Sequence, residues 1–585
     1  MTDLSQILAS INAVLWNETW LFIIVGTGIL FTVWSGFCQY RALTHAPAVI
    51  RGVYDDPNDP GAINHFQALT AALSGTLGLG NIGGVALAIA LGGPGAIFWM
   101  WVIGLFGMAI KFTEVTLSML YRNTDDPDNP HGGPMWVADR ALKKMRPELD
   151  WLGKTLAVVC SLCIALSACT GGNMFQAWNV ADVTFEYFGI AGWISGAVLT
   201  TLVAAVLLGG IKRIGMVTGV LVPVMVFFYI VAGIWVLAAN AGEIPGMLML
   251  IVKSAFTPTE ASGAFVGGTV ASAFLFGMKR AIFSNEAGQG SSAIAHSAVK
   301  TDEPVREGLV AGLEPFIDTI VVCTFTALII LSTGVWNRAP DTLFNNVPQA
   351  VQTQSGWQFA DSVLPGDNWR NDEAVMMIVA ADMNAASGLE LHRVPGTVRE
   401  TASGFTVQWD TYPGKTQPRN QDGGLYRDYV GATLTAKAFD SVTPGLGKWL
   451  ITIGSWLFAV STIIAWGYYG EQGAVYILGE RATVPYRIFY CLVAFVATLG
   501  HISTSSDLDN LTGIGLGVII YANLPILWIF GFQAMRAYKE YIGRLKRGQM
   551  GPDHPPPSID DLISGRDIRR QGSPSNSTPP PAASS

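Results

Sequence analysis

The residues best suited to chemistry lie in GTLGLGNIGG (residues 75–84), where glycines surround Thr76 and Asn81 inside a long apolar stretch. Each glycine costs a helix about 1 kcal/mol relative to alanine, and irregular backbone at membrane depth persists only where it lines a cavity or packs on protein. We therefore predict an interrupted helix whose free peptide groups face a polar ligand. Close packing of a regular helix through small residues is the alternative interpretation.

A second apolar segment, residues 262–298, is interrupted in the same way by Asn285, Glu286, Gly288 and Gly290. Broken helices in corresponding positions of two halves are a strong sequence pointer to the binding site of a transporter. The N-terminus of a half-helix favours a carboxylate, and free backbone carbonyls favour a cation. The two segments together predict a site for a carboxylate and a cation.

Charged residues inside apolar segments are costly and are candidates for function. Lys111 and Glu114 lie three residues apart on one helical face, where they could pair with each other near the cytoplasmic end. Glu314 and Asp318 lie four apart, also on one face. Because like charges repel, we expect one of these two carboxyl groups to meet a cation or to carry a proton.

Several uncharged polar residues have both a functional and a structural interpretation. Gln176 and Asn179 could reach a substrate or merely cap their helix. The adjacent hydroxyls of Ser461 and Thr462 could bond to their own helix or act as hard oxygen ligands for sodium. His296 is expected to be a packing or helix-end histidine. The six cysteines lie in or beside apolar stretches, so we predict neither a disulfide framework nor a metal cluster.

The elements that must position these residues are membrane helices. Of the 585 residues, 50% are hydrophobic and only 13% are charged, and the modest net charge of −8 with scattered basic residues argues against nucleic-acid binding. A bilayer-spanning helix needs roughly 20 apolar residues, and about eleven stretches approach that length. The expected spans are 19–38, 67–91, 95–120, 152–174, 188–208, 214–240, 262–298, 308–334, 446–470, 486–501 and 508–535.

Arginine and lysine gather in alternate short loops, which predicts an outer N-terminus and a cytoplasmic C-terminus. We predict an all-α polytopic protein whose membrane domain comprises residues 1–335 and 441–545. The polar residues 336–440 are expected to form a periplasmic insert, and the Pro- and Ser-rich residues 546–585 a disordered cytoplasmic tail. The two broken segments run in opposite directions, which predicts a five-plus-five inverted repeat preceded by one extra span.

Four segments carry a family resemblance: GNIGGVALAIALGGPGAIFWMW, HGGPMW, SNEAGQGSSAIAHSAVKTDEPVREGLVAGLEPFIDTIVVCT and FAVSTIIAWGYYGE. With them the chain closely resembles the alanine or glycine:cation symporter family over roughly residues 15–540, apart from the insert. Two departures are the GLGN sequence where familiar members have GTGN, which introduces Leu79, and the long insert. The insert is expected to be either an inert elaboration or a module for a periplasmic partner.

The resemblance implies a fold similar to that of the leucine transporter and sodium-driven uptake of alanine or glycine across the bacterial inner membrane, without any further cofactor or metal. The residues that it implies around the substrate are Thr76, Gly78, Gly80, Asn81, Gly83, Phe276, Asn285, Gly288 and Gly290, and we add Gln176 and Trp456 to this predicted substrate site. Those that it implies around sodium are Gly78, Asn81, Ser461 and Thr462. Phe276 and Trp456 would wall a small pocket.

Other classes of function have less support in the sequence. A proton-coupled symporter of a related amino acid, and an amino-acid sensor that does not transport, are the alternatives. An ion channel is disfavoured because no pore loop repeats. An enzyme is disfavoured because no Ser-His-Asp set, phosphate loop or metal cluster lies at membrane depth.

Overall fold

The computed structural model describes residues 2–354, 356–366, 369–384, 387–401, 404–429, 431–500, 505–550, 554 and 556–565. Within these ranges seven helices are long and apolar enough to cross a bilayer, and a bent pair makes an eighth span. The outward face of α11 (Gly210–Ala239) is apolar, with Val220, Phe227 and Trp235 all more than 60% exposed. Such a face is suited to lipid, so the chain is a multi-pass membrane protein. The expected total of eleven spans stays a prediction.

The first half of the bundle follows the expected spans closely. Its helices are α1 (Thr2–Leu15), α2 (Glu18–Ser35), α3 (Cys38–Ile50), α4 (His65–Thr76), η1 (Gly80–Gly84), α5 (Val85–Gly92), α6 (Gly95–Tyr121), α7 (Pro134–Met145), η2 (Pro147–Leu149), α8 (Asp150–Cys169), η3 (Thr170–Met174), α9 (Phe175–Phe188), α10 (Gly192–Leu207), α11 and α12 (Ile244–Ser254).

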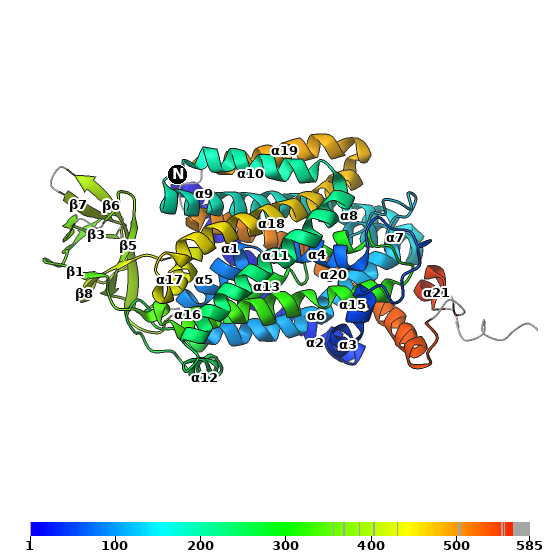
Figure 1. Ribbon diagram of the computed structural model, residues 1–585, viewed down its shortest axis with the longest axis horizontal. Coiled ribbons are helices and arrows are strands. Elements are labelled where there is room, and N and C mark those ends of the chain that lie inside the picture. The colour runs from blue at the N-terminus through cyan, green and yellow to red at the C-terminus, as the bar shows by residue number, and fades with distance from the viewer. Residues whose placement is uncertain are drawn as a thin grey trace, which may run out of the picture.

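The second half is interrupted by strands. Its helices are α13 (Val270–Asn285), α14 (Ser292–His296), α15 (Pro304–Ala311), η4 (Phe316–Cys323), α16 (Thr324–Ser332), η5 (Val335–Asn337), α17 (Ala432–Val442), α18 (Leu446–Leu478), η6 (Glu480–Ala482), α19 (Thr483–Ala497), α20 (Ser505–Lys546) and α21 (Ile559–Ser564). Figure 1 shows most of the long helices lying roughly along the long axis of the molecule.

Both glycine-rich segments break their helices, as their composition predicts. The axis bends by 53° between α4 and the pair η1–α5. A Cβ at Gly78, inside this break, would lie only 2.9 Å from the Thr462 hydroxyl, so the close approach of α18 requires glycine there. After α13 the backbone enters the left-handed region at Glu286, Gly288 and Gly290, with φ of 56°, 92° and 70°. The two glycines adopt this conformation without a Cβ penalty, which lets the chain turn between α13 and α14.

The expectation of an all-α chain is wrong for the insert, which folds as antiparallel β-structure. Alternating apolar and polar residues in segments such as GFTVQW place one face of the sheet on its own core. The order of the larger sheet is β1-β8-β5-β6-β7-β4, and β2 and β3 form a separate hairpin. The strands are β1 (Thr342–Leu343), β2 (Ala350–Thr353), β3 (Gly356–Phe359), β4 (Ser362–Val363), β5 (Ala374–Ala380), β6 (Leu391–Thr401), β7 (Gly404–Trp409) and β8 (Arg419–Arg427).

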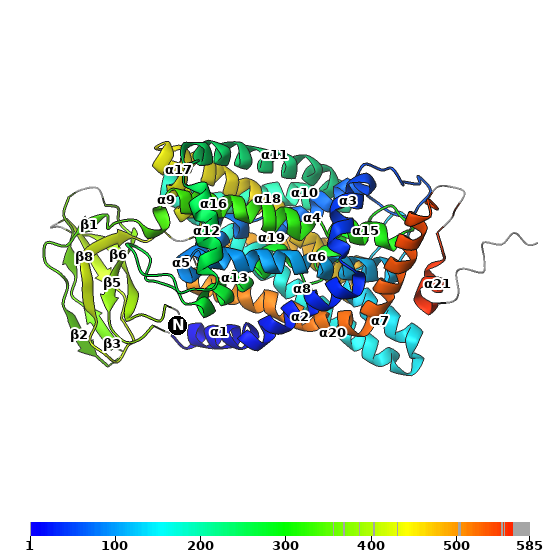
Figure 2. The same ribbon diagram turned by 90° about the horizontal axis from the view of Figure 1, so that it is seen from below.

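The sheet lies at one end of the helical bundle, and the N-terminal end of α1 lies on the same side (Figures 1 and 2). Helix α21 lies at the opposite end, where it packs against α20. A wholly disordered tail was expected, but residues 559–564 form this helix, because Ser558 caps it and Leu562 and Ile563 are buried. Residues 566–585 of the expected tail lie outside the described residues.

Arg393 on β6 joins the sheet to the bundle. Its guanidinium donates hydrogen bonds to the carbonyls of Ala90, near the end of α5, and Ala264, at 3.1 and 3.0 Å. The sheet therefore holds the second half of the first broken span, α5.

We expect Arg393→Gln to loosen that attachment, because hydrogen bonds from a charged group contribute about 1.5–3 kcal/mol. Amide hydrogen exchange should become faster in residues 86–93 and 255–269. Arg399→Gln is the matched control, because Arg399 lies on the same strand but is exposed and pairs with Asp372. Equal exchange in the two variants would show that the attachment does not depend on Arg393.

Candidate functional site

Four polar side chains converge beside the first break, and we call them the central cluster: Asn81, Ser284, Asp318 and Thr319. Asn81 donates from Nδ2 to the Ser284 hydroxyl at 3.0 Å and to Oδ1 of Asp318. The hydroxyls of Ser284 and Thr319 donate to Oδ2 of Asp318 at 2.9 and 2.8 Å. The central cluster thus joins three elements: η1 at the first break, the end of α13 at the second break, and the π-helical segment η4.

Asp318 is fully buried, and among the described residues no Lys, Arg or His nitrogen lies within 4.0 Å of its carboxylate. Its hydrogen-bond donors are all neutral. An isolated buried carboxylate is costly to ionise unless a cation accompanies it. The central cluster is therefore suited to a bound cation, either a metal ion or an ammonium group.

A second group of contacts joins the same break to α18. The hydroxyl of Thr462 donates to the carbonyl of Ser74 at 3.0 Å, and the hydroxyl of Ser74 donates to the carbonyl of Ser461 at 2.7 Å. The amide group of Gln176 also lies beside Gly78, and its buried Oε1 has no hydrogen-bond partner among the described residues. Carbonyl and hydroxyl oxygens around a break are the hard ligands that a sodium ion needs.

The structure brings most of the predicted site residues of the first broken span together. The amide N–H of Gly78 donates to Oδ1 of Asn81 at 3.0 Å. Thr76, two residues before Gly78, is buried, and its hydroxyl donates to the carbonyl of Leu73 on its own helix at 3.4 Å. Gly80 faces the ring of Phe283, and Gly83 faces the start of α17, which covers η1.

Asn285 of the second broken span also belongs here, since its Nδ2 donates to the Thr319 hydroxyl at 3.1 Å.

Four other predicted residues lie elsewhere. Phe276 packs against Gly92, and the indole N–H of Trp456 donates to Thr184 on α9 at 2.9 Å. Gly288 and Gly290 face α20 rather than the first break. The ring beside the first break is instead that of Phe283, next to Gly80, whereas Trp466 lies next to Gly172 in η3.

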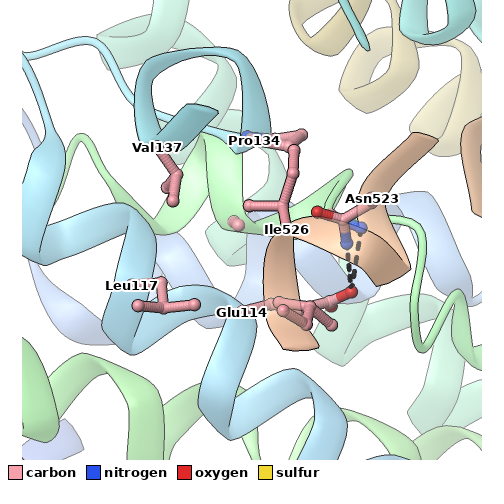
Figure 3. A pocket seen from close by; sticks show the side chains of 9 residues that line it. Glu114, Leu117, Pro134, Val137, Asn523 and Ile526 are labelled. Atoms are coloured by element: carbon pink, nitrogen blue, oxygen red, sulfur yellow. Dashed lines mark hydrogen bonds between the residues drawn. The ribbon is translucent and has the colours of Figure 1, made fainter. Parts of the chain in front are cut away.

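Gly290 borders a small cavity, shown in Figure 3, where Glu114 and Asn523 face each other. Oε1 of Glu114 accepts hydrogen bonds from Asn523 Nδ2 at 2.8 Å and from the amide of Gly290 at 3.1 Å. The volume of about 10 Å³ is enough for one water molecule. This contact joins α6 and α20 to the turn after α13.

One pairing expected from spacing is wrong, whereas the expectation that Glu314 or Asp318 meets a cation is confirmed for Glu314. Lys111 pairs with Glu314, at 3.3 Å, rather than with its neighbour Glu114. Glu314 also accepts a hydrogen bond from His296 at 2.6 Å, so that histidine belongs to an ion cluster and is not merely a packing residue.

Two uncharged polar residues bond within their own helices. Asn179 donates to the carbonyl of Phe175, and the Ser461 hydroxyl donates to the carbonyl of Phe458. Thr462 bonds across to α4.

The sequence predicted no site role for Ser284 or Thr319. It marked Asp318 as a candidate but did not identify the groups that its carboxylate contacts. The one available signal was the acidic residue in an apolar span. The hydroxyl residues carried no signal of their own, because Ser and Thr are common in membrane helices.

Comparisons with known proteins agree on one family. The sequence profile described as "Sodium:alanine symporter family" matches residues 1–364 and 417–554, so the internal stretch that it leaves unmatched, 365–416, lies in the β-insert. "Sodium/alanine symporter AgcS" of Methanococcus maripaludis is 37% identical over 493 residues, covering 84% of this chain and 88% of that protein. "Amino-acid carrier protein AlsT" of Bacillus subtilis is 31% identical over 404 residues, covering 66% and 82%.

Among solved structures, the crystal structure of MhsT in complex with L-phenylalanine aligns with 82% of this chain and 93% of that chain, at a TM-score of 0.48 and 13% identity. The family profile covers most of the sequence on both sides of the insert, and the relatives share a third of their residues with it. The chain belongs to the sodium:alanine symporter family.

Proposed function

We propose that the protein is a secondary transporter that takes up a small neutral amino acid, alanine or glycine, together with sodium. Membership of the family supports sodium-coupled amino-acid transport. The observation that carries the proposal is the buried Asp318 beside the broken helix, with no Lys, Arg or His nitrogen within 4.0 Å of its carboxylate among the described residues. A transported cation is the charge that this carboxylate lacks.

In this proposal Thr462, Ser461 and the carbonyls near Gly78 hold one sodium ion. The N-terminal end of η1 faces the substrate carboxylate, since the first amides of a helix have no partner within it. Asp318, through the central cluster, holds the positive charge of the substrate amine or of a second sodium ion. Because each ligand neutralises the other's charge, each raises the affinity of the other.

The inner membrane is the proposed location, with the N-terminus and the sheet outside and the C-terminus in the cytoplasm. Each positive charge that moves inward gains about 2.3 kcal/mol per 100 mV of membrane potential. A sodium gradient of similar size doubles this gain, which suffices for roughly a thousandfold accumulation at about 1.4 kcal/mol per tenfold. The ring of Phe283, which lies next to Gly80, is the proposed wall of a small pocket in place of Phe276 and Trp456.

The test is uptake of radiolabelled alanine into proteoliposomes under an inward sodium gradient, repeated with choline in place of sodium. Accumulation only with sodium supports the symporter. Uptake without sodium would instead indicate proton coupling, and binding without uptake would indicate a sensor. Leucine or glutamine carried as fast as alanine would contradict the small pocket.

Thr462→Val removes a proposed sodium ligand while keeping the shape of the side chain. We expect the sodium concentration for half-maximal uptake to rise about tenfold, which corresponds to the loss of about 1.4 kcal/mol. Thr201→Val is the control, because Thr201 is exposed on α10 and bonds only within its own helix. An unchanged sodium dependence in Thr462→Val would remove α18 from the sodium site.

A further inference from the structure

A continuous series of ionisable side chains runs through the interior away from the central cluster. We call it the buried ion chain, and in spatial order it contains Lys111, Glu314, His296, Glu307, His65 and Asp55.

Every link of the buried ion chain is a direct contact. Nζ of Lys111 lies 3.3 Å from Glu314, whose other oxygen lies 2.6 Å from Nε2 of His296. Nδ1 of His296 contacts one oxygen of Glu307, and Nδ1 of His65 contacts the other. Nε2 of His65 lies 3.5 Å from Asp55. Imidazole and carboxylate groups therefore alternate, with hydrogen bonds from Glu314 to His65 and a longer ion-pair contact from His65 to Asp55.

The two ends of the chain lie in different surroundings. Lys111 also donates to the hydroxyl of Ser292 at 2.7 Å, at the start of α14 and just after the second break. Asp55, at the other end, is 42% exposed, whereas the four groups between them are at most 2% exposed. Asp55 lies in the loop between α3 and α4, which the distribution of basic residues places on the cytoplasmic side.

Other charges near the chain do not interrupt it. Glu114 and Glu286 are close enough to Lys111 to interact with it electrostatically, but they bond to Asn523 and to Trp466 respectively. Arg122 lies near Glu307 and is occupied with backbone carbonyls around residue 299. The two histidines are thus flanked by carboxylates.

We propose that the buried ion chain is a proton-binding site that fills from the cytoplasm, and that its proton and the transported sodium ion disfavour each other. Histidine is the side chain whose ordinary charge change falls between about pH 5 and 8. One proton on His296 adds one positive charge to the buried ion chain, and loss of that proton to water past His65 and Asp55 removes it. This step exchanges one proton with water and needs no other reactant.

The coupling follows from electrostatics in a medium of low dielectric. Glu314 lies one helical turn before Asp318, so a proton on the chain and a cation at the central cluster share one poorly screened region. Linkage is reciprocal: sodium binding must expel the proton, and cytoplasmic acid must weaken sodium binding. The proton then promotes release of sodium on the side from which the proton enters. This inference rests on the proposed sodium coupling.

The experiment uses the full-length protein in detergent, in weakly buffered solution with a pH-indicator dye. Sodium chloride is added near pH 7, with choline chloride as the blank, and radioactive sodium measures binding in parallel. We expect sodium to release protons from the wild type and to bind about tenfold more weakly at pH 6 than at pH 8, within the usual range of coupling between sites. In His296→Gln sodium should bind with little pH dependence and release no protons.

His392→Gln is the matched control, since His392 lies on β6 in the sheet, outside the buried ion chain, and bonds to the carbonyl of Asp382. His65→Gln replaces His296→Gln if the latter does not fold. Sodium binding without proton release in the wild type, or equal pH dependence in all variants, would overturn the inference. An absence of sodium binding would overturn the proposed function itself and this inference with it, and the parallel binding measurement distinguishes the two failures.

Discussion

Asp318→Asn should abolish sodium-driven alanine uptake while leaving a folded protein. The substitution keeps the size of the side chain but removes the charge that faces the proposed cation. A unit charge pair about 4 Å apart at an effective dielectric of about 20 is worth about 4 kcal/mol, or roughly a thousandfold in affinity. Uptake in proteoliposomes measures the loss, and protection from thermal unfolding by sodium measures binding separately.

The control for that experiment is Asp182→Asn, because Asp182 also lies in a membrane helix, α9, but is exposed. We expect its sodium dependence to match that of the wild type. Should Asp318→Asn transport alanine with wild-type sodium dependence, the central cluster would be a structural network rather than the cation site.

Arg122→Met should cause the largest loss of stability. The guanidinium of Arg122 donates to the carbonyls of Ser297, Val299, Thr301 and Pro60, at 2.9, 2.7, 2.5 and 3.2 Å. Burial lowers the pKa of Arg122 to about 10, which leaves it charged at neutral pH. Methionine leaves four carbonyls without this donor, and each charged hydrogen bond contributes about 1.5–3 kcal/mol. We expect the melting temperature in detergent to fall by at least about 5 °C.

Two further variants serve as a control and as a partial rescue for Arg122→Met. Arg51→Met removes an exposed arginine at the end of α3 and should leave the melting temperature unchanged. Arg122→Lys should recover only part of the loss, because an ammonium group cannot donate to carbonyls on two sides as the planar guanidinium does. A melting temperature of Arg122→Met equal to that of Arg51→Met would show that water satisfies these carbonyls equally well.

Local composition was enough to predict the helical bundle and its breaks. Apolar length predicts where a helix can cross a bilayer, and clustered glycine predicts where it cannot remain regular, as at residues 75–84. The insert was only weakly predictable, since a segment such as residues 404–409 alternates like a strand but does not indicate its partners. In the structure β7 pairs with β6 and β4, and only the complete sheet determines that order.

The partners of the buried charges could not be predicted, because helical spacing relates residues of one helix only. Spacing placed Lys111 near Glu114, yet the bundle presents Lys111 to Glu314, more than 200 positions along the chain. It placed Asp318 on the same face as Glu314, but not beside Asn81 on another span. These contacts depend on how the spans pack, and hydropathy carries no information on that packing.

The same long-range pairing constrains the order in which the chain assembles during synthesis. Helix α6 carries Lys111 and Glu114 in a membrane span, and their partners Glu314 and Asn523 are made much later. At about 5–20 residues per second the ribosome needs roughly 10–40 s to reach Glu314. During that interval each unpaired charge in lipid costs about 2.5–3.5 kcal/mol. The nascent protein must therefore keep α6 near water, or beside the insertion machinery, until its later spans emerge, and chains truncated before residue 314 should be favoured substrates for membrane quality control.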